Sequence, residues 1–174
     1  MGNSIYLSIK KKSEVIINDL KFPDFIKRDE NKKAFSLLFE MFNYLGLDIN
    51  INDIYYSNNG KPYIKNSNIK FNYSHSNNYI ACSISSVEMG VDIEDEFKMS
   101  DEARRLYLSG IKDNYTKAFV MKEAYCKLLG DFDDDFFKCL DINSISKNKY
   151  EINNDTYDLV LFYEGNNKNI NIIL

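Results

Sequence analysis

Residues 71–94 read FNYSHSNNYIACSISSVEMGVDIE and contain three short apolar segments separated by polar turns. Short apolar runs bounded by polar turns are typical of β-strands. We therefore predict strands over Phe71–Tyr73, Tyr79–Ser85 and Gly90–Glu94. The polar turn after the first of them holds His75, the only histidine of the chain. This segment therefore combines a predicted sheet with a candidate functional group.

Helices are predicted on both sides of these strands. Apolar residues at helical spacing predict one helix over Glu30–Leu45 and another over Tyr115–Leu129, and a glycine that can stop the helix follows each directly. Ser100 can cap a third helix that runs to about Ser109. The helix over Tyr115–Leu129 has the strongest pattern of the three.

Further strands complete the pattern. Ser4–Ile9 is strand-like, and a hairpin is predicted from Asp53–Ser57 and Pro62–Lys65, which flank Asn58-Asn59-Gly60. We predict a last hairpin from Tyr157–Tyr163 and Asn169–Leu174, around a turn that contains Gly165. The order of these elements indicates an α+β fold. A helix followed by strands occurs about twice, which permits two similar halves.

Composition excludes several classes of protein. The chain has 174 residues, of which 44% are hydrophobic and 28% charged, as in globular domains and unlike disordered or collagen-like chains. No apolar run reaches the roughly 18 residues of a transmembrane helix, and we expect no secretory signal, no membrane association and a cytoplasmic protein. A net charge of −4 disfavours nucleic acid as a partner. Cys82, Cys126 and Cys139 show no metal-binding spacing, and we expect buried free thiols.

Two carboxylates lie two residues apart in the predicted strand Gly90–Glu94. Because alternate residues of a strand point to the same face, Asp92 and Glu94 should project together at the surface, with Val91 and Ile93 in the core. Adjacent carboxylates repel unless a cation neutralises them, and ligation by oxygen alone favours Mg²⁺, with Mn²⁺ as the alternative. A solvated strand face without any metal remains the other interpretation.

The predicted helix Tyr115–Leu129 places Glu123 and Lys127 together on the face opposite its apolar arc, with Lys122 at the border of that arc. An ordinary surface ion pair is one interpretation of this Glu–Lys spacing. The other makes Glu123 a third metal carboxylate and Lys127 a contact for phosphate.

Three weaker signals accompany these motifs. Hydroxyl side chains surround His75 in Asn72-Tyr73-Ser74-His75-Ser76, where they could bind an anion or be purely structural. Gly60-Lys61-Pro62 could meet a nucleotide or could simply form a turn. Lys27, Arg28, Lys32 and Lys33 open the first helix, whose N-terminus could hold a phosphate or form a solvated face.

The order of the motifs carries more weight than any one of them. Gly60-Lys61-Pro62, then Asn-x-Ser-His-Ser from Asn72, then Gly-Val-Asp-Ile-Glu from Gly90, then Lys-Glu-Ala-x-x-Lys from Lys122 resembles the 4′-phosphopantetheinyl transferase superfamily, in its Sfp-like branch. Members of that family move the phosphopantetheine arm of coenzyme A to a serine of an acyl or peptidyl carrier protein and release adenosine 3′,5′-bisphosphate. The matching segment runs from about Phe25 to Lys127.

The resemblance implies a fold of two similar α/β halves about a pseudo-twofold axis, here 1–86 and 87–174, with the site between them. The first half would face the nucleotide of coenzyme A, and the second would carry the metal-binding carboxylates. The chain is shorter than most members of this two-half branch and longer than the single halves that must trimerise, and a monomer is expected.

The resemblance also assigns roles to residues. The metal ligands for Mg²⁺ would be Asp92, Glu94 and Glu123, and the catalytic residues would be Asp92, Glu123 and Lys127. Glu123 would also be the base for the serine hydroxyl, directly or through a metal-bound water. The residues that would bind coenzyme A are Lys33, Gly60, Lys61, Pro62, Ser74, His75 and, in addition to its catalytic role, Lys127. The chain departs from the family where it has Phe119 in place of a tryptophan, Lys33 in place of an arginine, and Ala34 in place of a small hydroxyl residue.

Two other functions fit parts of the pattern. Glu96-Phe97-Lys98 provides the E-x-K of a magnesium-dependent nuclease, with Asp92 as its partner acid. Alternatively, the chain could keep the transferase fold and bind carrier proteins without catalysis. The intact Asp92, Glu94, Glu123 and Lys127 disfavour the second alternative.

Overall fold

The computed structural model describes residues 2–17, 21–96, 98–166 and 168–173. Within these ranges helices occur with largely antiparallel strands, which confirms the predicted α+β class. The elements are β1 (Ser4–Lys11), α1 (Asp29–Tyr44), β2 (Ile54–Tyr56), β3 (Pro62–Ile64), β4 (Lys70–His75), β5 (Tyr79–Ser85), β6 (Met89–Glu94), α2 (Asp101–Tyr107), α3 (Tyr115–Leu129), α4 (Asp134–Cys139), β7 (Asn148–Asn153), β8 (Asp158–Tyr163) and β9 (Asn169–Ile172). None of the described helices has the length and apolar character needed to cross a membrane.

The larger sheet has four strands in the order β4-β5-β1-β9. Helix α1 covers one of its faces, because Phe35, Leu38 and Phe42 pack against Phe71 and Ile84 in one buried cluster. This is the apolar stripe that predicted the helix, and burying it stabilises both elements.

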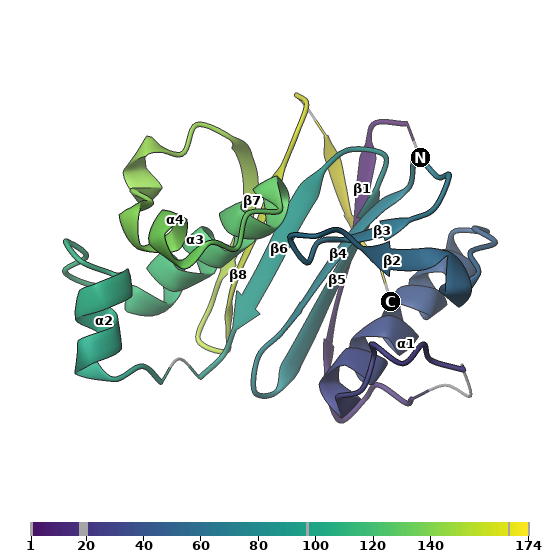
Figure 1. Cartoon of the computed structure of the whole chain (residues 1–174), viewed down its shortest axis with the longest axis horizontal. Helices are drawn as coiled ribbons and strands as arrows, with labels where there is room; N and C mark the ends of the chain where they lie inside the picture. The colour runs from purple at the N-terminus through teal and green to yellow at the C-terminus, as the bar shows by residue number, and fades with distance from the viewer. Residues whose placement is uncertain (1, 18–20, 97, 167, 174) are drawn as a thin grey trace.

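The second sheet has three antiparallel strands in the order β6-β8-β7. Helix α3 covers one face through Val120, Ala124 and Leu128, which pack with Val160 and Phe162. The other face packs on the larger sheet, in a shared cluster made of Ile5, Leu7, Ala81, Met89, Val91, Ile93, Leu159 and Leu161. Figure 1 shows β6 between β8, its neighbour in the second sheet, and strands β4 and β5 of the larger sheet. Strand β6 therefore lies where the two sheets meet.

Backbones approach very closely where β6 meets α3. A Cβ built on Gly90 would lie 2.2 Å from both the Ala124 carbonyl oxygen and the Leu128 backbone nitrogen. Real Cβ atoms do not approach other atoms so closely, so only glycine fits at this position. The contact brings Asp92, two residues further along β6, next to the last turns of α3.

The predicted last hairpin is wrong. Strand β8 pairs with β6 and β7, whereas β9 pairs parallel to β1, with Ser4 opposite Asn169. Both edges of β8 are already occupied, because β6 and β7 pair with them. The buried Leu159–Phe162 of β8 form the centre of the second sheet. In Figure 1 the yellow β9 lies beside the purple β1 in the larger sheet, whereas β8 belongs to the other sheet. Leu174, the end of the predicted strand, lies outside the described residues.

Two short elements and one thiol also differ from expectation. The prediction missed α4 and β7, because the short α4 begins in a run of aspartates and β7 is largely polar. All three cysteines are free, but Cys139 is exposed, so its predicted burial is wrong. It ends the short α4, whose residues are not buried. The predicted division at 86/87 falls between β5 and β6 and stays a prediction, and β9 pairs across it with β1.

Candidate functional site

A cavity of about 380 Å³, the first cavity, lies between the β2–β3 hairpin, β4, β6 and α3. Most of the residues singled out from the motifs line it, although they come from four separate segments. They are Gly60 and Pro62 of the hairpin, Ser74 and His75 of β4, Asp92 and Glu94 of β6, and Glu123 and Lys127 of α3. Folding therefore brings the motifs together at one place.

Asp92 is the centre of the polar contacts in this cavity. Its Oδ1 accepts hydrogen bonds from Lys127 Nζ at 2.6 Å and from Ser74 Oγ at 2.6 Å, and Lys127 Nζ also donates to Ser74 Oγ at 3.0 Å. Asp92 is 3% exposed, so it is not the surface carboxylate expected from the strand pattern. Docking of α3 over Gly90 covers it. Burial of a carboxylate is costly unless a cation pairs with it, and the ammonium of Lys127 provides that partner.

The other oxygen of Asp92 has no hydrogen-bond partner among the described residues, although it is fully buried. Glu94 lines the same cavity, and burial, followed by the charge of Asp92, raises the pKa of Glu94 to about 7. Asp92 thus has an oxygen without a partner in the described part of the chain, and Glu94 has a raised pKa. A bound cation would stabilise both carboxylates. Within the described ranges, no three Asp, Glu, His or Cys side chains already form a metal site.

Glu123 and Lys127 share one face of α3, as the helical spacing predicts. Glu123 Oε2 lies 3.8 Å from Lys127 Nζ, and both side chains line the first cavity. Burial raises the pKa of Glu123. For Lys127, burial alone would lower the pKa, but the charges of Asp92 and Glu123 outweigh it and raise the pKa. Lys127 therefore stays protonated and supplies a fixed positive charge.

His75 lines the same cavity beside Ser74. Burial, assisted by the positive charges of Lys12 and Lys127, lowers the pKa of His75. The imidazole is therefore neutral at pH 7, and it can donate one hydrogen bond to an anion and accept another.

The side chains of two residues expected to bind coenzyme A do not line the first cavity. Lys33 Nζ donates to the carbonyl oxygen of Lys12. Lys61 is buried at 4% exposure, and its ammonium donates to the carbonyl oxygen of Leu128 at 2.7 Å. The backbone around Lys61 borders the cavity through Gly60 and Pro62, whereas its side chain does not line it.

Lys122, the first residue of the Lys-Glu-Ala motif, also lies outside the first cavity. Its ammonium donates to the carbonyl oxygens of Tyr107, Phe137 and Lys138 at 2.8–3.2 Å. Burial lowers its pKa. Lys122 therefore has a structural role, because it joins the ends of α2 and α4 to α3. Helical phase alone predicted only that Lys122 lies at the border of the apolar arc.

The residues expected to bind metal or coenzyme A are not the only ones that line the first cavity. It is also lined by Tyr56, Asn72, Tyr73, Phe119 and Phe132. The Tyr56 and Tyr73 hydroxyls share a hydrogen bond of 2.9 Å, and Asn72 Oδ1 accepts the backbone N–H of Val91, which ties β4 to β6. Asn72 and Tyr73 stand directly before Ser74 in the motif, so its first residues were a usable signal. For Phe132, we find no such signal in the sequence.

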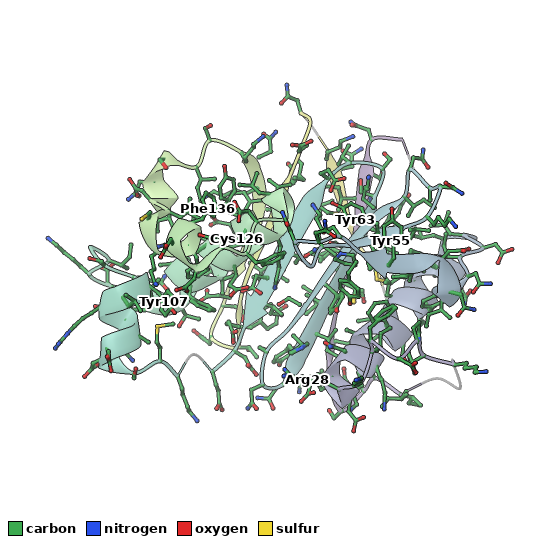
Figure 2. All side chains as sticks on the ribbon, in the orientation of Figure 1. Arg28, Tyr55, Tyr63, Tyr107, Cys126 and Phe136 are labelled. Atoms are coloured by element: carbon green, nitrogen blue, oxygen red, sulfur yellow. The ribbon has the colours of Figure 1, made fainter. Side chains whose placement is uncertain are left out.

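A second cavity of about 380 Å³ adjoins the first and shares Phe119, Glu123 and Phe132 with it. Its other walls are mostly apolar or aromatic: Met99, Tyr107, Cys126, Asp134 and Phe137. Figure 2 labels Tyr107 and Cys126 on the side of the molecule that carries α2, α3 and α4. Glu123 therefore stands where a charged cavity meets an apolar one.

The nuclease pattern is not assembled in the described residues. Glu96 and Lys98 pair with each other at 3.2 Å with largely exposed side chains, and neither lines the first cavity with Asp92. Phe97, between them, lies outside the described residues.

Comparison with protein-family models finds none that matches this chain, and comparison with curated proteins finds no match either. Function must therefore be inferred from the residues that line the first cavity and from the order of their motifs.

Proposed function

We propose that this protein is a 4′-phosphopantetheinyl transferase that modifies a serine of an acyl or peptidyl carrier protein with the phosphopantetheine arm of coenzyme A. The observation that carries the proposal is the contact of Ser74, Asp92 and Lys127 in one cavity. These residues come from three separate motifs of the family-like order, and hydrogen bonds join them directly. Adenosine 3′,5′-bisphosphate would be the other product.

The two cavities match the two ends of coenzyme A in polarity. The first cavity offers the ammonium of Lys127 and the imidazole of His75 to phosphate oxygens. The second cavity has apolar walls suited to the uncharged arm. Glu123, at the junction, stands where the arm would join its phosphate.

Asp92, Glu94 and Glu123 would hold Mg²⁺, or Mn²⁺ in its place. The residues fit such an ion because their donor set consists of oxygens and the buried Asp92 Oδ2 lacks a partner among the described residues. The bound ion would neutralise charge on the phosphate oxygens.

The chain's own residues would supply positioning and proton transfer. The serine hydroxyl of the carrier gives its proton to the Glu123 carboxylate, and its oxygen attacks the phosphorus nearest the arm. The bond from that phosphorus to the bridging oxygen breaks, and the electron pair leaves with the nucleotide. Lys127 and His75 hold the phosphate oxygens in line, and such positioning accounts for much of the catalysis of phosphoryl transfer.

We further propose that the chain forms the two-half arrangement of this family, as a monomer in the cytoplasm. Each sheet carries one long helix, α1 on the larger and α3 on the smaller, and the first cavity lies where the sheets meet. Residues 1–86 and 87–174 would be the halves, with β9 returning to the first.

Incubation with coenzyme A, Mg²⁺ and a panel of apo-carrier proteins tests the proposal. We expect the mass of at least one carrier to increase by that of the phosphopantetheine arm, on its serine. Tight binding of a carrier without transfer would instead identify a non-catalytic binding protein. Magnesium-dependent cleavage of DNA without transfer would support the nuclease.

We predict that transfer requires a divalent cation. Excess EDTA should abolish transfer, and added Mg²⁺ or Mn²⁺ should restore it, because three carboxylates on one cavity repel without a cation. Mg²⁺ should also raise the melting temperature of the free protein. Full activity in excess EDTA would overturn the metal assignment.

His75→Ala should raise the Michaelis constant for coenzyme A and leave turnover nearly unchanged. A contact to the nucleotide phosphates exists in the ground state and the transition state alike, so its loss affects binding. Dephospho-coenzyme A should be a poorer substrate for the wild type, and His75→Ala should narrow that difference. Asn77→Ala, in the exposed turn after β4, is the control. An unchanged constant would place His75 outside the binding site.

A further inference from the structure

Lys61 makes its charged contacts inside the protein. It stands between Gly60 and Pro62, which line the first cavity, but its own side chain is 4% exposed and does not line that cavity. A lysine is almost never buried this far without partners that compensate its charge. The contacts of this ammonium therefore indicate what the residue does.

Two partners hold the ammonium. Lys61 Nζ donates to the Leu128 carbonyl oxygen at 2.7 Å and forms an ion pair of 2.7 Å with Glu88 Oε2. The other oxygen of Glu88 pairs with Lys70 at 2.8 Å. We call the two contacts of Lys61 Nζ the Lys61 tie.

The carbonyl of Leu128 belongs to the last turn of α3, where carbonyl groups lack partners within the helix and the helix dipole favours a cation. Lys127, the residue that holds Asp92, lies in the same turn. The stem of Lys61 also packs near Gly130, the left-handed residue that ends the helix. The tie therefore meets α3 at the turn that carries a cavity residue.

The β2–β3 hairpin forms a separate two-stranded sheet, and such sheets are only marginally stable alone. Ser57 closes it, since its backbone N–H donates to the Lys61 carbonyl and its Oγ accepts the Lys61 N–H. Other contacts anchor the hairpin to β4, such as the Tyr56–Tyr73 hydrogen bond. The Lys61 tie anchors it to α3, which carries another wall of the first cavity.

We propose that Lys61 is a positioning residue, whose tie to Leu128 and Glu88 fixes the Gly60 and Pro62 wall of the first cavity relative to the last turn of α3. It acts through backbone and helix, without touching the ligand. The effect on coenzyme A binding rests on the proposed function, whereas the effect on the hairpin does not.

The test uses Lys61→Met, which keeps the apolar stem and removes the ammonium, and Glu88→Gln, which keeps the Leu128 contact. Lys65→Met, on the exposed residue directly after β3, is the matched control. Hydrogen exchange of the Gly60 and Lys61 amides, both bonded to Ser57, reports on the hairpin, and amides of α1 report on global stability.

In Lys61→Met, we expect these two amides to exchange at least about tenfold faster, with α1 unchanged. Glu88→Gln should give a smaller increase in the same direction, and Lys65→Met none. The Michaelis constant for coenzyme A should rise at least about fivefold in Lys61→Met, with turnover less affected. If Lys61→Met does not fold, the exchange rates of the same two amides in Glu88→Gln test the proposal.

Exchange within twofold of wild type in the hairpin, or an increase of equal size in α1, would overturn the proposal. If the hairpin amides exchange faster in Lys61→Met but the wild-type protein transfers the arm to no carrier, the positioning role of Lys61 stands and the proposed function is refuted. If the wild type transfers the arm but these amides do not exchange faster in Lys61→Met, the proposed function stands and the positioning role of Lys61 is refuted.

Discussion

Asp92→Asn should reduce transfer below detection, by more than about a thousandfold. The substitution keeps the shape of the side chain and removes the charge that holds Lys127 and would bind the metal. Loss of charge stabilisation of about 4 kcal/mol corresponds to that factor. The mass of the carrier after incubation measures the transfer, and activity within tenfold of wild type would contradict the assignment.

The buried position of Asp92 adds a consequence for stability. Breaking one side of a buried ion pair costs about 3–5 kcal/mol when the remaining charge stays uncompensated. Lys127 keeps Glu123 at 3.8 Å, so we expect a cost toward the lower end of that range. The double variant Asp92→Asn with Lys127→Met should recover part of the melting temperature and none of the activity. This separates a folding defect from a chemical one.

Glu123→Gln should lower turnover at least about a hundredfold, or about 2.7 kcal/mol in activation free energy. Gln keeps the size of the side chain and cannot accept the hydroxyl proton, and loss of a general base typically costs about 10²–10⁴-fold. The burial that raises the pKa of Glu123 also makes its carboxylate a stronger base. Turnover is measured at saturating coenzyme A and carrier.

The melting temperature of Glu123→Gln, measured without metal, should change little. Its ion pair with Lys127 is long and its side chain is one-third exposed, so the pair contributes only a few tenths of a kcal/mol. Glu96→Gln, an exposed carboxylate outside the first cavity, is the control and should retain full turnover. Turnover of Glu123→Gln within threefold of wild type would refute both proposed roles of the residue.

Local signals in the sequence predicted most of the elements. The predicted bounds Tyr115–Leu129 are those of α3, because Asn114 caps its first turn and Gly130 adopts the left-handed conformation that ends it. The cap at Ser100 is likewise confirmed. The β8–β9 hairpin was wrong because strand partners depend on which edges remain open, and distant segments decide that.

The candidate site can also be divided into features that local patterns predict and features that depend on distant segments. Helical phase predicted the shared face of Glu123 and Lys127, and the order of motifs predicted which segments would meet. The predicted contact of Lys61 with coenzyme A stays a prediction, and its side chain lies outside the lining of the first cavity. The burial of Asp92 depends on how closely α3 docks, and no local pattern around Asp92 contains that distance.

That docking distance is set at Gly90, where strand and helix backbones meet without a side chain between them. Elsewhere in a core, a change of side chain can be absorbed by neighbours that rotate or shift, and the spacing of elements drifts with the sequence. Here the spacing between β6 and α3 is determined by main-chain atoms, which every sequence shares. At this point the β6–α3 contact has no side chain to change, and a substitution of Gly90 itself would move the helix that carries Lys127 away from the strand that carries Asp92.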